Sequence, residues 1–219
     1  MKRFAVLVLC FALAACAAPP ADLLDLGPSP VVAPQAVEIV QWGAPPQNAV
    51  ATVFADLRGQ FKFKVYIGSR PNNLSPANPP PLTQLADRLR GDLPLSTIVV
   101  MLTDRPLPPL GGGKASPRHG AASVARRVVM ASTDGIEIGE NQTGPNLVSK
   151  MVLHLFAHVL VVGHAPDRVK SLMNDWRDNL GRLRRLPDNY DSRALSRLDR
   201  WLRSVTPDGQ SPTPAPAAH

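Results

Sequence analysis

Three of the chain's five histidines, His154, His158 and His164, fall in one short segment of the sequence. The first two are four residues apart, so on a helix both imidazoles project from one face. The third comes six residues later, directly after Gly163. Neutral imidazole is a good zinc ligand, and three imidazoles that leave a fourth position open make the type of site in which zinc activates water. The spacing therefore predicts a zinc site.

These imidazoles need a scaffold, and the apolar pattern around them predicts one. A long apolar helix is expected over residues 146–162, where it would carry the first two histidines. Before it, strands are expected over 61–67, 97–102 and 128–131, with a short amphipathic helix over 82–89. After it, two amphipathic helices are expected over 169–183 and 195–205. This order predicts an α+β (α/β-like) domain: a small mixed, twisted sheet packed on a central helix, with a C-terminal helical extension.

The histidine segment resembles the metzincin zinc peptidases, whose motif is H-E-x-x-H-x-x-G-x-x-H followed by a methionine turn. His154, His158 and His164 match its three ligand positions, and Met173 lies where the methionine belongs. The surroundings are similar to the small archaeal-type (archaemetzincin) and matrixin-like members. The resemblance implies zinc as cofactor and a peptidase-type cleft. It also implies that residues 128–132 form the edge strand that holds substrate peptide.

Two positions depart from this motif. Leu155 stands where the family has the glutamate that takes a proton from the zinc-bound water, and no other acid lies between residues 147 and 162. Loss of a positioned base typically costs a reaction 10²- to 10⁴-fold. Val161 stands where the family has a glycine in a left-handed conformation, which strains a β-branched residue. If the helix instead continued to Gly163, the side chain of His164 would point roughly 80° away from that of His154 around the helix axis. It could then bind the same ion only if a turn at Gly163 brought it back.

Other polar residues are weaker candidates for this site. His119 is expected in a surface loop, with an approach to the site as the less favoured alternative, and His219 ends a tail without chemistry of its own. Glu137 and Glu140 are the nearest upstream acids, although nothing local directs either toward the metal. The basic cluster Arg182, Arg184 and Arg185 is expected to be a solvated helix face.

The N-terminus predicts export. Lys2 and Arg3 precede an uncharged apolar run over residues 4–13, which is typical of a secretory signal and too short for a transmembrane helix. The sequence Leu-Ala-Ala-Cys ending at Cys16 resembles the lipobox of bacterial lipoproteins, in which the cysteine receives a diacylglycerol and its new amino group an acyl chain such as palmitate. More than one acyl chain on one residue anchors a protein stably. Because Ala17 and not an aspartate follows, the resemblance favours the periplasmic side of the outer membrane.

The amino-acid composition limits which metal ligands and which partners the chain can have. The two cysteines are Cys10, in the expected signal, and Cys16, so the mature domain has no thiol for a disulfide or a metal. The net charge is +7, but aromatic residues are sparse and not interleaved with the basic ones. Export and the lack of stacking platforms together argue against nucleic acid as a partner.

Proline-rich stretches separate the expected domain from an N-terminal tether and a C-terminal tail. Residues 1–15 are expected to be the signal peptide and 16–50 a Pro/Ala-rich tether, in which 37–40 could add an edge strand. Residues 51–205 are expected to form the metzincin-like domain with its C-terminal helices, and 206–219 a disordered tail.

Three functions remain open from the sequence. The first is a membrane-anchored periplasmic lipoprotein whose metzincin-like domain lost its base and binds a peptide or an envelope partner. The second is an active zinc-dependent metallopeptidase with a non-standard base. The third is a structural envelope lipoprotein without metal, whose histidines belong to the core.

Overall fold

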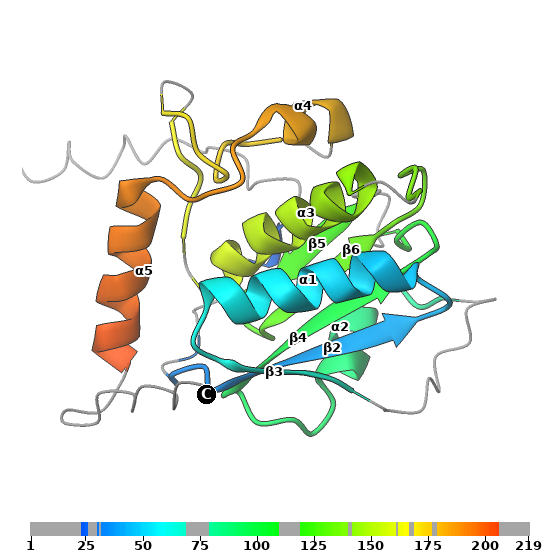
Figure 1. The fold of residues 1–219 in the computed structure, drawn as a ribbon. Coiled ribbons are helices and arrows are strands. Elements are labelled where there is room, and N and C mark those ends of the chain that lie inside the picture. The colour runs from blue at the N-terminus through cyan, green and yellow to red at the C-terminus, as the bar shows by residue number, and fades with distance from the viewer. Residues whose placement is uncertain are drawn as a thin grey trace, which may run out of the picture.

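The structure is a computed structural model that describes residues 23–25, 30, 32–68, 79–109, 119–139, 142–160, 162–166, 169–176 and 179–205. The described residues form one six-stranded sheet with helices on both faces (Figure 1). This confirms the predicted α+β class with a mixed sheet.

Six strands make up the sheet, in the order β1-β5-β6-β4-β2-β3. Within it, β5 and β6 pair antiparallel and every other neighbouring pair is parallel. The central strand β4 is buried along its whole length, as parallel strands covered on both faces are. The strands are β1 (Leu23–Asp25), β2 (Ala36–Trp42), β3 (Lys64–Ile67), β4 (Thr97–Thr103), β5 (Gly120–Ser123) and β6 (Val128–Ser132).

In the part of the chain that the structure describes, five helices accompany the sheet: α1 (Gln47–Gln60), α2 (Leu82–Arg90), α3 (Thr143–Val159), α4 (Leu180–Arg185) and α5 (Ser192–Val205). The helices α1 and α3 cover one face and α2 the other (Figure 1). The α3 helix is apolar almost all round because the sheet, α1 and the C-terminal segment bury nearly every one of its residues. It is therefore rigidly placed, which suits a helix that carries two potential ligands.

The expected boundary between tether and domain at residue 50 is wrong. The β2 strand lies inside the sheet, between β4 and β3, and not at an edge. The α1 helix begins at Gln47 and buries Ala49, Val50, Val53 and Leu57 in the core. The described prolines of this segment lie outside β2 and interrupt none of its ladder hydrogen bonds; they are Pro30, Pro34, Pro45 and Pro46.

The expected edge strand is also misplaced. Residues 128–132 form β6, but β6 lies between β4 and β5, and β1 lies outside β5. The strand over 61–67 is shorter than expected, since β3 begins at Lys64, and β3 forms the opposite edge of the sheet. Residues 169–176 do not form the expected helix but make turns, and the helices in the described residues after them are α4 and α5.

Several predictions concern residues that the structure does not describe. These are the signal peptide over 1–15, Cys16, most of the expected tether before residue 30, Glu140 and the tail over 206–219 with His219. Among the described residues, no helix is long and apolar enough to cross a membrane.

Candidate metal centre

The α3 helix and the turn after it position the three histidines. His154 and His158 lie one turn apart on α3 and are 0% and 3% exposed. The helix ends at Val159, and the Val162 amide returns to the Ala157 carbonyl at 2.9 Å. The alternative in which the helix continues to Gly163 is therefore wrong. Val161, where strain was expected, is outside the described residues.

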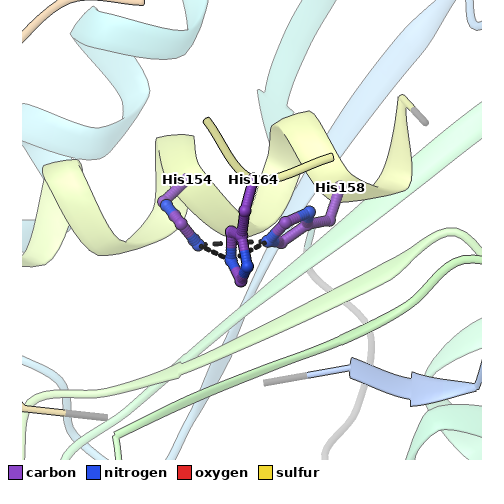
Figure 2. Close-up of side chains that lie close together, drawn as sticks. All are labelled: His154, His158 and His164. Atoms are coloured by element: carbon purple, nitrogen blue, oxygen red, sulfur yellow. Dashed lines mark hydrogen bonds between the residues drawn. The ribbon is translucent and has the colours of Figure 1, made fainter. Parts of the chain in front are cut away.

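The turn brings His164 back to the other two rings. The three Nε2 atoms lie 3.1, 3.1 and 3.2 Å from one another. Figure 2 shows the rings of His154, His158 and His164 converging below the helix. Tetrahedral zinc, with Zn–N bonds of about 2.0–2.1 Å, separates its ligand atoms by roughly 3.3 Å. The spacing of the three nitrogens thus suits one zinc ion held on their common axis.

Backbone carbonyls determine the tautomers of two of these rings. The Nδ1 atom of His154 donates to the Leu172 carbonyl at 2.8 Å, and that of His158 donates to the Val162 carbonyl at 2.8 Å. A carbonyl can only accept, so both Nδ1 atoms carry hydrogen, and Nε2 is the atom of each ring that a metal can bind. The two Nε2 atoms lie 3.1 Å apart, close enough for one ion to bind both. Metal-binding histidines typically have this second hydrogen bond.

A tight turn supplies the Leu172 carbonyl. The Met173 amide donates to Ser171 Oγ at 3.0 Å, and the Ser171 amide donates to Asn174 Oδ1 at 2.9 Å. The Ala165 amide donates to the Met173 carbonyl at 2.8 Å, which links this turn to the segment that carries the third histidine. Met173, the residue predicted for the methionine turn, is fully buried in a small apolar cluster with Ala157, Val162 and Ala194.

Leu155 lies where a general base would be expected. Its side chain is fully buried and faces β5, since a Cβ added to Gly120 would lie 2.7 Å from Leu155 Cδ1. Among the described residues, the potential metal-binding cluster consists of the three histidines and includes no carboxylate. The three histidines can therefore hold a cation, but this cluster itself contains no carboxylate that could take a proton from bound water.

Comparison with known proteins gives a consistent result for the fold. No protein-family model and no curated protein matches the chain. It is similar in structure to an archaemetzincin from Methanopyrus kandleri, with a TM-score of 0.60 and 21% identity, covering 78% of this chain and 96% of that one.

Two further solved structures agree with this. A zinc-dependent peptidase from Methanocorpusculum labreanum has a TM-score of 0.56 and 16% identity, covering 74% of this chain and 99% of that one. An archaemetzincin from Archaeoglobus fulgidus, complexed with malonate, has a TM-score of 0.58 and 15% identity, with the same coverage of 74% and 99%. The chain thus has an archaemetzincin-like fold, and the predicted resemblance is confirmed for the fold.

The remaining candidates do not join the cluster. His119 is 7% exposed just before β5, so the expectation of a surface histidine is wrong, yet it is not part of the metal-binding group. Glu137 is exposed. The sequence reasoning missed Ser171 and the two accepting carbonyls, because a backbone acceptor leaves no signature in side-chain types.

Proposed function

We propose that this protein is a zinc-binding pseudopeptidase: an archaemetzincin-like domain that holds zinc through His154, His158 and His164 but does not hydrolyse peptides efficiently. The observation that carries the proposal is the convergence of three Nε2 atoms within 3.2 Å beside a buried Leu155. The ligands fit the metal, whereas the neighbouring side chain cannot move a proton.

The donor set supports zinc over other cations. Three imidazoles in a largely apolar surrounding favour a borderline-soft ion, whereas magnesium and calcium prefer oxygen ligands. Bound there, zinc would polarise a water or a carbonyl oxygen at its open position. The Trp176 ring is fully buried with its centre 6.3 Å from that of His154, and an apolar ring at this position would limit the access of solvent to a bound zinc ion.

Peptide or partner binding is the role that remains for such a domain in the envelope. A zinc ion can hold a carbonyl oxygen without cleaving the bond beside it. The rival function, an active metallopeptidase, would need a base from outside the described cluster or sufficient hydroxide at the metal itself. Zinc content and peptidase activity, measured on one preparation of the full chain, separate the two functions.

Ser171 is a positioning residue for this site. Its Oγ accepts from the Met173 amide at 3.0 Å and from the Asp191 amide at 3.3 Å, and so holds the Leu172 carbonyl against His154. We expect Ser171→Ala to weaken zinc affinity about tenfold, because outer partners of metal-binding histidines contribute 10- to 100-fold. Competition with a chromogenic chelator measures this.

A matched control is Ser196→Ala, which removes the hydroxyl of an exposed serine that bonds only within α5. Its zinc affinity should equal that of the unaltered chain. If both serine variants bound zinc equally well, the Ser171 hydroxyl would have no part in orienting the metal ligand.

We also propose that the domain is anchored in the outer membrane through Cys16, facing the periplasm. Support comes from the basic start, the short apolar run and the Leu-Ala-Ala-Cys sequence. Expressed in a two-membrane bacterium with labelled palmitate, the full chain should incorporate label. Cys16→Ser should abolish incorporation, and Cys10→Ser should leave it unchanged. Equal labelling of all three chains would refute an anchor at Cys16.

A further inference from the structure

The outer edge of β5 is occupied by a short piece of the chain's own N-terminal segment. Residues Leu23–Asp25, which we call the strap, form β1 and pair parallel with β5, with Leu23 opposite Ala122 and Asp25 opposite Ser123. The register shifts between the two ends of the strap, so the ladder is irregular. This edge lies beside the candidate metal centre, because Gly120 at the start of β5 contacts Leu155 of α3.

The strap inserts one leucine on each face of the sheet. Leu23 is partly buried against the core cluster that contains α3, and Leu24 against the opposite cluster that contains α2. Alternating side chains reach opposite faces of any strand, so two adjacent apolar residues fill both positions at once. The β5 edge therefore offers a main-chain ladder and one apolar position on each side. These are the elements by which a sheet edge recognises an extended peptide.

The chain just after the strap is held independently. Arg127 donates to the Pro30 carbonyl at 2.8 Å and to the Val32 carbonyl, and the Gln35 amide donates to the Ser96 carbonyl at 2.7 Å. The strap can therefore leave β5 without disturbing β2, which begins at Ala36. Its own attachment is weak, since each hydrogen bond of a three-residue ladder contributes only about 0.5–1.5 kcal/mol.

We propose that the strap is a displaceable self-ligand on the β5 edge, and that the same edge accepts an extended peptide carrying two adjacent bulky apolar residues, bound parallel to β5. The inference rests on the peptide-binding part of the proposed function and not on zinc. A competing peptide must displace a segment whose effective concentration, through a short connection, is in the millimolar range. Binding to the intact protein is consequently weak until the strap is released.

The strap would also set the distance between domain and membrane if Cys16 is the anchor. With the strap paired, the chain from Cys16 to Leu23 spans at most about 25 Å. With the strap released, the free chain extends to Pro30 and its reach becomes about 50 Å. Peptide binding at β5 would thus let the domain move away from the bilayer.

The experiment measures binding of a fluorescent peptide with the strap's own sequence, Ala-Asp-Leu-Leu-Asp-Leu-Gly, to the full chain in detergent. In one variant Leu23→Ser and Leu24→Ser are combined, which removes both apolar contacts of the strap. We expect this variant to bind the peptide at least about tenfold more tightly than the unaltered chain. The control Val32→Ser alters an exposed residue of the same segment and should leave peptide affinity unchanged.

Hydrogen exchange at residues 120–123 gives a second readout. The β5 amides that point toward the strap should exchange faster in the strap variant, and the added peptide should restore their protection, whereas those that point toward β6 keep their partners. If circular dichroism shows that the double substitution unfolds the chain, a deletion of residues 21–27 replaces it. Equal peptide affinity for variant and unaltered chain, or no binding to a folded variant, overturns the proposal. Zinc content measured on the same samples reports on the proposed function separately.

Discussion

Replacing His158 with alanine should remove nearly all bound zinc, lowering the content of the purified chain from about one ion to less than about 0.1 per molecule. His158 Nε2 lies 3.1 Å from the Nε2 atoms of both His154 and His164, so its loss removes one of the three ligand atoms that would surround the ion. Two imidazoles then remain, which is fewer than protein zinc sites use. Elemental analysis after dialysis measures the change.

The same substitution should lower thermal stability. Zinc present at a hundredfold excess over its Kd stabilises the folded chain by about 2.7 kcal/mol. In a domain of this size that loss corresponds to roughly 5–10 °C in Tm. A chelator should lower the Tm of the unaltered chain by a similar amount and leave that of His158→Ala unchanged.

His119→Ala is the matched control, because His119 is buried but is not part of the cluster. Its zinc content should stay at about one per chain, whatever happens to its stability. Equal zinc content in His158→Ala and the unaltered protein would mean that the metal lies elsewhere, or that the histidines serve only the core.

Introducing a carboxylate at position 155 should create peptidase activity where the unaltered protein has little. Leu155→Glu places a carboxylate one residue after the ligand His154, on the side of α3 that faces β5. A positioned base contributes 10²- to 10⁴-fold, so cleavage of a quenched fluorescent peptide should rise by at least about a hundredfold. The measurement requires a zinc-loaded sample.

Leu155→Gln is the control for this variant, since it has the same length and polarity without the ability to take a proton. It should remain as inactive as the unaltered chain. Peptide cleavage by the unaltered chain that His158→Ala abolishes would contradict the pseudopeptidase account directly. A zinc-loaded Leu155→Glu variant without activity would show that the missing base alone does not explain the inactivity.

The site was largely predictable because its residues follow each other closely in the sequence. The spacing of His154 and His158 requires only a helix, and the uninterrupted apolar pattern of residues 146–162 predicts one. The return of His164 was less certain, because a β-branched Val161 disfavours the turn that a glycine would allow. In the structure the helix ends early enough at Val159 for that return.

The surroundings of the site were less predictable because tertiary contacts and not local patterns determine them. The β5 strand reads Gly-Ala-Ala-Ser and has no strand propensity, yet close packing on α3 at Gly120 demands small residues there. The turn around Met173 has apolar residues at helical spacing, but the side chains of Ser171 and Asn174 bond its backbone and hold it in another conformation. The prolines on both sides of β2 made this part of the chain resemble a tether, so the sequence predicted at most an edge strand there.

The number of zinc ions per chain in the purified protein shows whether His154, His158 and His164 form a metal site. We expect about one tightly held zinc, because three Nε2 atoms that converge within 3.2 Å, two of them on rings whose Nδ1 atoms bond carbonyls, match the ligand spacing of zinc. A folded protein that contains no zinc after expression in zinc-supplied medium, and gains none when zinc is added, would contradict it.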